Sequence, residues 1–295
     1  DVLRQAFSLG ITLFDTADIY GVDGHNERLL GRAMQGVRKS VCLSTKFGFT
    51  KTDDRLAKNA VCARPDYVRS ACEQSLRNLG TDYIDIYYMH RLDPGVAVEE
   101  TVGAMADLVA SGKVRAIGLC EVSAATLQRA MAVHPVSVVQ SEFSLWTRDV
   151  QSNGVLAACE KLGVSLVPFS PLGRGFLTGG LSAATTYDAN DLRSRMPRFQ
   201  KENLKENVKL LERLARFSAD KGASCGQVAL AWLLAQSDRV IPIPGMDRAE
   251  HLRDNVGAVD LELSPSDLAF LDQLFPPGAA KGDRYSPNGM KMVHM

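Results

Sequence analysis

Short apolar runs alternate with amphipathic stretches along most of this chain. The apolar runs are typical of buried strands, and the amphipathic stretches have the period of helices. Seven strands are predicted, at Ile11–Asp15, Val41–Lys46, Tyr83–His90, Val114–Leu119, Val136–Gln140, Val164–Phe169 and Val240–Ile243. A repeated strand–helix order predicts a parallel sheet covered by helices.

The amphipathic stretches predict ten helices, several of them with clear start and stop signals. Pro at the start and Gly after the end bracket the third of them, and Ser123 and Ser264 are expected to cap two others. The ten are Asp1–Leu9, Asn26–Met34, Pro65–Leu79, Val96–Val109, Ser123–Ala132, Val155–Leu162, Leu204–Lys221, Cys225–Gln236, Arg248–Val256 and Ser264–Leu274. Residues 173–200 show no period and are expected to form a long loop.

An α/β barrel of the (β/α)8 type explains the pattern better than a doubly wound sheet. Polar residues follow nearly every strand, and no change of composition divides the chain. We therefore predict one barrel domain over residues 1–275 and a tail, 276–295, that frays. A closed barrel of this type has eight strands. Because only seven are found, we interpret the sequence as a piece of a longer protein that lacks the first strand.

Composition argues against several classes of partner. The 34 basic and 34 acidic residues give no net charge, which disfavours binding to nucleic acid or to an anionic membrane. The six cysteines include no CxxC pair, so reduced thiols in a cytoplasmic protein are expected. The longest apolar stretch, Val228–Ala235, is too short to cross a bilayer. No close pair of histidines suggests a metal site.

Candidate chemistry lies at the ends of the first three strands. Asp15, Tyr20, Lys46 and His90 follow or end these strands, so a parallel sheet brings them to one edge. Lys46 is expected to lower the pKa of the Tyr20 phenol, with Asp15 holding the amine in place. A ring N–H of His90 can orient a carbonyl oxygen toward the tyrosine. Each residue alone has an ordinary structural explanation, but together they form a general acid for carbonyl reduction.

Two later loops are candidates for binding an anion. The loop after Phe169 reads SPLGRGFLTGG, and the one after Ile243 reads PGMDRAEHLRDN and opens a short helix. Glycine backbone, Arg174 and a helix N-terminus suit a phosphate group. Ordinary turn chemistry is the alternative for both loops.

Several longer motifs together resemble the aldo-keto reductases. They are FDTADIYG, GHNERLLG, LSTKFG, DIYYMHRLDP, GKVRAIGL, VVQSEFSLWTRD, PFSPLGRGFLTG and IPIPG. They are most similar to the branch of broad-range aldehyde and ketone reductases that has YYMHR-DP and SLWTRD. The resemblance implies a barrel that binds NADPH in an extended form and transfers its hydride to a small-molecule carbonyl substrate.

The same resemblance implies roles for individual residues. Asp15, Tyr20, Lys46 and His90 match the catalytic tetrad of the family. The residues that match its cofactor site are Cys120, Glu121, Gln140, Phe169, Ser170, Leu172, Gly173, Arg174, Gly245, Met246, Arg248, His251, Asp254 and Asn255. Cys120 stands where a serine is usual, and Met246 stands where a serine or threonine usually helps to bind phosphate. The family also has a hairpin and a first strand before the segment that matches Asp1.

Two other functions remain open from the sequence. The chain could be a regulatory or channel-associated subunit that keeps the cofactor, or a truncated reductase without activity. The complete tetrad favours the enzyme. Substrate preference is expected to depend on the loops Phe49–Arg64 and Leu181–Gln200, and the sequence does not indicate an oligomeric state.

Overall fold

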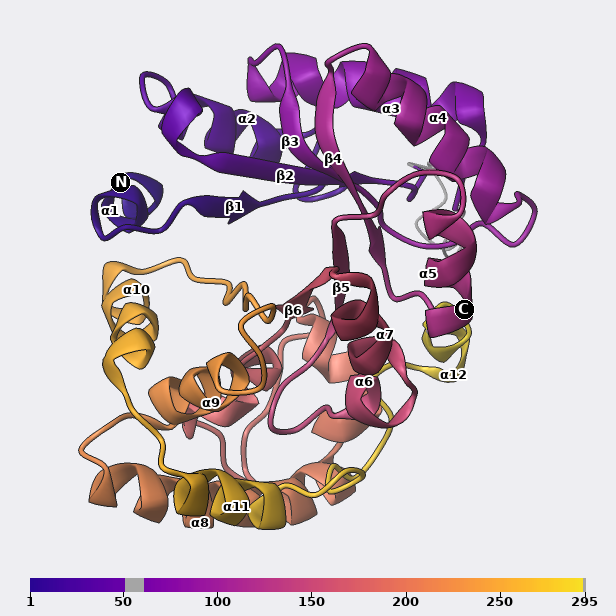
Figure 1. The fold of residues 1–295 in the computed structure, drawn as a ribbon. Coiled ribbons are helices and arrows are strands. Elements are labelled where there is room, and N and C mark those ends of the chain that lie inside the picture. The colour runs from indigo at the N-terminus through magenta and orange to yellow at the C-terminus, as the bar shows by residue number, and fades with distance from the viewer. Residues whose placement is uncertain (51–60, 294–295) are drawn as a thin grey trace. The chain divides into compact units, whose positions relative to one another are not determined.

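The computed structural model describes residues 1–50 and 61–293, which form two compact units. Unit 1 comprises residues 1–140 and 158–164, and unit 2 comprises residues 141–157 and 165–293. In Figure 1, unit 1 begins in indigo and unit 2 ends in yellow. Each unit is described by itself below.

Unit 1 contains a parallel sheet whose neighbouring strands follow one another along the chain. Its strands are β1 (Leu13–Asp15), β2 (Cys42–Phe47), β3 (Ile84–Met89), β4 (Val114–Cys120) and the first part of β5 (Val138–Glu142). The register sets Asp15 beside Ser44, Lys46 beside Tyr88 and Cys120 beside Gln140. The carboxyl ends of these strands therefore lie along one edge.

Helices cover one face of this sheet (Figure 1). Thr45 and Tyr87 face them: Thr45 Oγ1 donates to Glu27 at 2.7 Å, and Tyr87 hydroxyl donates to the Val68 carbonyl at 3.3 Å. Because strand side chains alternate, the neighbouring Ser44, Lys46 and Tyr88 point to the opposite face. The helices are α1 (Val2–Ser8), α2 (His25–Ala33), η1 (Arg38–Ser40), α3 (Pro65–Leu79), α4 (Val98–Ala110) and α5 (Ala124–Met131).

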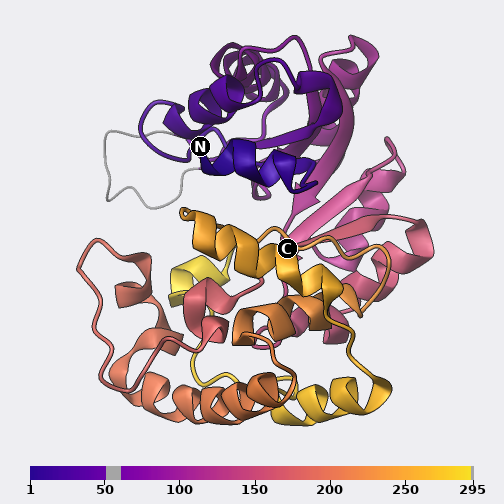
Figure 2. The same ribbon diagram turned by 90° about the vertical axis from the view of Figure 1, so that its left-hand side faces the viewer.

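Unit 2 is mainly helical and contains one complete strand, β6 (Ser165–Phe169), the neighbour of β5 in the sheet. Its two long outer helices are α8 (Lys201–Asp220) and α11 (Pro265–Leu274). They pack together through Phe217 and Phe270, whose ring centroids are 5.0 Å apart, and lie at the lower edge of Figures 1 and 2. The other elements are α6 (Asp149–Ser152), α7 (Val155–Leu162, which unit 1 shares), η2 (Gly173–Thr178), η3 (Leu192–Arg195), η4 (Pro197–Phe199), α9 (Cys225–Leu234), α10 (Ala249–Val256), η5 (Gly257–Asp260) and α12 (Pro287–Met290).

Six of the seven predicted strands are present, with ends that differ by up to two residues. The seventh, expected at Val240–Ile243, forms only an isolated bridge between Val240 and Leu166. Its amides at Ile241 and Ile243 donate to β6, at 2.9 and 3.1 Å. The alternate residues Pro242 and Pro244 have no N–H group, so they cannot donate to a second neighbour.

The predicted helices are also present, and the caps at Ser123 and Ser264 are confirmed. The short helices α6 and α12 were not predicted, because four residues are too few to show a helical period. Residues 173–200 are irregular apart from short 3₁₀ turns. The predicted loop Phe49–Arg64 lies partly outside the described residues.

The expectation that the tail after Phe275 frays is wrong for residues 276–293. Arg284 is only 3% exposed, and its guanidinium pairs with Glu142 and Asp149. The amide side chain of Asn207, on α8, bonds both the N–H and the carbonyl of Lys281. A buried arginine needs carboxylate partners, and these hold the tail against unit 2.

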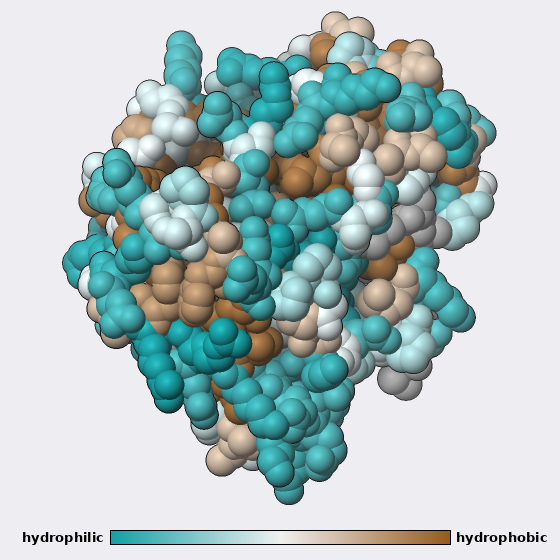
Figure 3. Space-filling view, turned by 60° about the horizontal axis from the view of Figure 1, so that its bottom comes forward, coloured by the Kyte–Doolittle hydropathy of each residue, from teal (hydrophilic) through white to brown (hydrophobic). Residues whose placement is uncertain are grey.

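Hydrophobic groups on the face drawn in Figure 3 occur as separate small areas between hydrophilic side chains. Within residues 1–50 and 61–293, no helix is both long and apolar enough to cross a membrane.

Two glycines inside helices test the packing of unit 1. A Cβ atom on Gly31, in α2, would lie 2.2 Å from the Leu79 carbonyl oxygen, whereas one on Gly103, in α4, would meet no atom within 4 Å. Alanine favours a helix over glycine by up to about 1 kcal/mol. Gly103→Ala should therefore stabilise the protein slightly, and Gly31→Ala should destabilise it by about 1–3 kcal/mol through overpacking. Urea unfolding measures both, and a Gly31→Ala protein as stable as the parent would contradict the close contact.

Candidate active site

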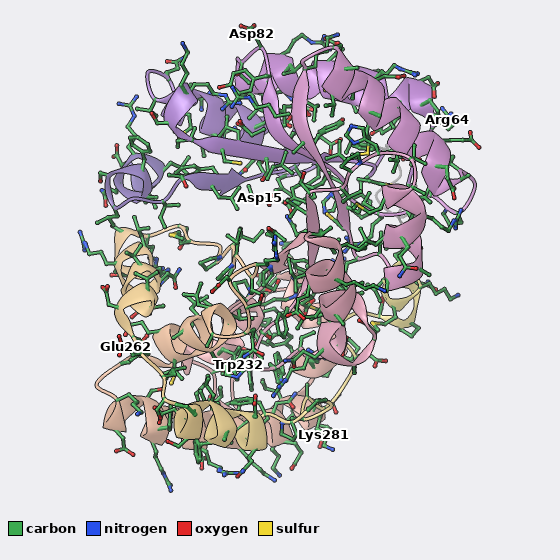
Figure 4. All side chains as sticks on the ribbon, viewed as in Figure 1. Asp15, Arg64, Asp82, Trp232, Glu262 and Lys281 are labelled. Carbon is green, nitrogen blue, oxygen red and sulfur yellow. The ribbon has the colours of Figure 1, made fainter. Side chains whose placement is uncertain are left out.

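The centre of the candidate site is an ion pair between Lys46 on β2 and Asp15 at the carboxyl end of β1. Asp15 is labelled in Figure 4. The Lys46 side chain has no exposed surface, and that of Asp15 is 11% exposed. The amine also donates to the Thr16 carbonyl at 2.8 Å. A buried ammonium group requires such partners, so the pair fixes the end of β1 against β2.

The strand pattern explains why these groups meet. Ser44 and Lys46 are two residues apart on β2 and so point to the same face, and the register sets Ser44 beside Asp15. Ser44 Oγ donates to Asp15 Oδ1 at 2.7 Å, and Gln140 Nε2 donates to the same oxygen at 3.1 Å. Lys46 pairs with Oδ2, so both carboxylate oxygens are held.

Burial alone would lower the pKa of Lys46, but the neighbouring groups reverse this. Asp15, and after it Tyr20, raise the pKa, and it ends above its ordinary value. Lys46 is therefore a cation at neutral pH despite its complete burial.

Tyr20 lies in the loop after β1, with its ring close to this cation. Lys46 Nζ is 5.0 Å from the centre of the ring. The loop is tied to its neighbours by Asn26, whose backbone N–H donates to the Tyr20 carbonyl, and by the Asp18 amide, which donates to the Lys46 carbonyl at 3.1 Å. The Tyr20 residue is 40% exposed, so this part of the candidate site is open to solvent.

Burial of Tyr20 outweighs the predicted lowering of its pKa by Lys46. Many protein atoms surround the phenol although the residue is partly exposed, and burial raises its pKa. Lys46 lowers the pKa by its charge and by a hydrogen bond, Asp15 raises it, and the net pKa is above the ordinary value. Desolvation of the phenolate thus outweighs the nearby ammonium, and Tyr20 is protonated at neutral pH.

His90 follows β3 directly and lies beside Tyr20. The two ring centroids are 6.0 Å apart in an edge-to-face arrangement, and Phe49 contacts the His90 ring in the same way at 4.8 Å. Burial, then the charges of Lys46 and Arg91, lower the pKa of His90 well below its usual value. A neutral imidazole has one N–H donor, as the predicted role requires.

Three residues predicted to contact the cofactor also belong to unit 1. Gln140, on β5, is 3% exposed and lies beside Cys120, the last residue of β4. Burial raises the pKa of the Cys120 thiol to about 12, so the group stays neutral and is a weak hydrogen-bond donor. Glu121 follows, with a positive φ of 54° that re-aims the chain at the end of the strand.

The glycine loop after β6 belongs to unit 2. The backbone turns tightly here, because φ is positive at three successive residues: 58° at Gly173, 57° at Arg174 and 87° at Gly175. A Cβ on Gly173 would lie 3.1 Å from the Trp146 ring, so a side chain there would be both crowded and strained by the positive φ. Arg174, predicted to lie beside a pyrophosphate, donates to Tyr285 hydroxyl at 2.9 Å and pairs with Glu142 at 3.4 Å.

The second predicted anion segment is adjacent within the same unit. Ile243 N–H donates to the Pro168 carbonyl, so the chain after residue 243 starts next to the end of β6 and Phe169. Asn255 on α10 is 9% exposed, and its Nδ2 has no hydrogen-bond partner among the described residues. Asp254 accepts from Ser224 Oγ at the start of α9. Unit 2 therefore brings together both loops that sequence patterns selected.

The remaining predicted residues of unit 2 differ in how open they are. Arg248 and His251 are exposed and pair with Glu250 and Asp247 at 3.3 Å each. Gly245 has open space where a Cβ would be, and Ser170 has a positive φ of 48°. Met246, Phe169 and Leu172 are half-buried.

Sequence reasoning missed two residues of this region. Ser44 could have been found from its position two residues before Lys46, which sets both side chains on one face. Glu142 ends the apolar strand β5, as Asp15 ends β1, and three arginines surround it: Arg174, Arg198 and Arg284. Arg198 and Arg284 lie in segments without a helical or strand period, so no sequence pattern indicated them.

Comparisons with known proteins show which family the chain belongs to. A sequence profile described as the Aldo/keto reductase family matches residues 1–275. A probable aldo-keto reductase from Glycine max is 44% identical over 285 residues, which cover 96% of this chain and 81% of that protein. The chain belongs to the aldo-keto reductase family.

Solved structures of aldo-keto reductases have the same fold. A glycerol dehydrogenase from Gluconobacter oxydans superposes with a TM-score of 0.86 at 27% identity, covering 97% of this chain and 86% of that one. An aldo-keto reductase from Klebsiella pneumoniae, in complex with NADP and acetate, gives a TM-score of 0.74 at 27% identity, covering 97% and 87%. With the sequential parallel strands, this confirms the predicted (β/α)8 class, here with fewer strands than a closed barrel.

The low pKa of His90 should make stability depend on pH. Below about pH 6.5 the unfolded chain binds a proton that the folded protein does not, so the free energy of unfolding falls as the pH falls. Between pH 7.5 and 5.0, the free energy of unfolding of His90→Gln should fall by about 1–2 kcal/mol less than that of the parent protein. Urea unfolding at both pH values measures this, with the half-exposed His134→Gln as control. An equal acid loss in His90→Gln and the parent would refute a neutral His90.

Proposed function

We propose that this aldo-keto reductase reduces aldehydes or ketones to alcohols with NADPH, and that Tyr20 donates the proton. The observation that carries the proposal is the buried Lys46–Asp15 pair with the Tyr20 ring 5.0 Å from the amine. The relatives with bound NADP or NADPH support the cofactor. The proposal extends to the catalytic roles of the four residues.

Tyr20 is suited to give up its proton to a developing alkoxide. It is protonated at neutral pH because burial raises its pKa, and it faces a fixed cation that stabilises the phenolate once the proton has left. Asp15 holds that cation in place. The neutral His90 ring beside Tyr20 can donate one hydrogen bond to the substrate oxygen and so orient the carbonyl.

Bound NADPH would supply the hydride, and each unit, taken by itself, has residues that suit a part of such a ligand. In unit 1, Gln140 offers its amide oxygen on the face of the sheet opposite the helices. In unit 2, the half-buried Phe169 ring at the end of β6 can stack on a planar group. The tight backbone at Gly173 suits close approach of a phosphate, and the unpartnered Asn255 amide suits a polar group of the nucleotide. Met246 supplies no hydroxyl for a 2′-phosphate.

Replacing Tyr20 by phenylalanine tests the proposed acid. Tyr20→Phe should lower kcat/KM for an aromatic aldehyde by about 10²–10⁴-fold, because the proton donor is lost while the ring remains. NADPH oxidation, followed by absorbance, measures the rate, and a fluorescence titration checks that NADPH still binds.

Tyr83→Phe is the matched control, since the Tyr83 hydroxyl is buried without a hydrogen-bond partner among residues 1–50 and 61–293. It should leave the rate nearly unchanged. A Tyr20→Phe enzyme as fast as this control would contradict the assignment. NADPH binding by the parent protein without turnover of any carbonyl would instead favour the regulatory subunit.

Met246 offers a test of cofactor preference. Met246→Thr adds a hydroxyl at the position where the family usually binds the 2′-phosphate, and a hydrogen bond to a charged group contributes about 1.5–3 kcal/mol. The dissociation constant for NADPH should therefore fall by about tenfold. That for NADH should change little, so the ratio of the two constants is the readout. An equal effect on both cofactors would show that Met246 does not face the phosphate.

A further inference from the structure

We propose that Ser44 is a positioning residue of the active site, which holds Asp15 through a neutral hydroxyl and so sets the acidity of Tyr20. The inference rests on the function proposed above. Ser44 is 1% exposed, and its Oγ donates to Asp15 Oδ1 at 2.7 Å. The other acceptor within reach, the Phe14 carbonyl, is 3.4 Å away, so the carboxylate is the main partner.

The position of Ser44 on the strand makes this contact a fixed one. Ser44 is paired in register with Asp15 itself, and the Thr16 N–H donates to the Ser44 carbonyl at 2.9 Å. Backbone bonds on both sides thus hold the hydroxyl beside the carboxylate. Serine is also short, with a single rotatable bond to its oxygen, so little conformational freedom is lost.

The three donors on Asp15 are not equivalent. Lys46 holds Oδ2, whereas Ser44 and Gln140 share Oδ1. Gln140 is also one of the residues proposed to bind the cofactor, so its side chain has a second proposed partner. The Ser44 hydroxyl lies much closer to Oδ1 than to the Phe14 carbonyl, at 2.7 Å against 3.4 Å, so it holds Oδ1 whichever way the Gln140 amide turns.

The contact between Ser44 and Asp15 affects Tyr20 through the negative charge of Asp15. The groups that act on the Tyr20 phenol are Lys46 from β2, Asp15 from β1 and Cys120 from β4, with the neutral His90 ring beside it. Asp15 disfavours the phenolate, because both are anions. A hydroxyl dipole aimed at Oδ1 offsets part of the Asp15 charge without adding a charge of its own, so it makes Tyr20 a better acid.

Removing the Ser44 hydroxyl should therefore raise the pKa of Tyr20 and slow the reduction. In Ser44→Ala the Asp15 charge is less compensated, the phenol holds its proton more tightly, and reduction slows. We expect kcat to fall by about tenfold, the value for loss of one hydrogen bond to a charged group. The alkaline limb of the pH profile of kcat should move to higher pH, and KM for the aldehyde should change less than twofold, on the order of experimental error.

The matched control is Ser75→Ala, on α3. Ser75 is fully buried in unit 1, and its hydroxyl has no hydrogen-bond partner among the described residues. Both variants lose one buried oxygen, so effects on general packing should be alike. Ser44→Cys is the second variant, because it keeps a similar volume but donates weakly. Its kcat and pH profile should lie between those of the parent and Ser44→Ala.

Steady-state reduction of an aromatic aldehyde by NADPH, from pH 6 to pH 11, measures all four proteins. A lower kcat with a displaced alkaline limb in Ser44→Ala, an intermediate Ser44→Cys and an unchanged Ser75→Ala support the inference. An active parent whose Ser44→Ala profile equals that of Ser75→Ala overturns this inference alone. A parent without any NADPH-dependent reduction overturns the proposed function, and this inference with it.

Discussion

The buried ion pair between Lys46 and Asp15 is the constraint on which unit 1 depends. An ammonium group without exposed surface is tolerated only when its charge and its protons are matched, and removing one member of such a pair costs about 3–5 kcal/mol. The match requires β1 and β2 in their observed register, with the Thr16 carbonyl in reach. The ion pair and the register of β1 against β2 therefore depend on each other.

The same buried setting explains which of the groups around the ion pair are neutral and which are charged. Burial raises the pKa of Tyr20 and lowers that of His90, so both are neutral at physiological pH, while Lys46 remains charged because Asp15 is beside it. The site thus holds a proton on the phenol and a fixed cation next to it. Unit 2 has a comparable buried carboxylate, Glu142, which gathers three arginines and fixes the C-terminal tail through one of them.

The alternation of apolar runs and helices was enough to predict the sheet, because parallel strands bring their carboxyl ends to one edge wherever the chain starts. It also placed Asp15, Lys46 and His90 correctly at that edge. The net pKa of Tyr20 could not be predicted, since it depends on how densely folded atoms surround the phenol as well as on the charges of Lys46 and Asp15. The packed tail was missed because its contacts, Arg284 to Glu142 and Lys281 to Asn207, join residues far apart in the chain.

The central claim is that Asp15 and Lys46 act on Tyr20 in opposite directions across the end of the sheet. The most direct test is to measure the pKa of Tyr20 by NMR with ¹³C-labelled tyrosine. The chemical shift of the ring carbon that bears the hydroxyl is followed against pH, without cofactor or substrate. The account predicts that the pKa of Tyr20 is higher than in a model peptide, falls in Asp15→Asn and rises in Lys46→Met. A Tyr20 pKa that is the same in all three proteins would contradict it.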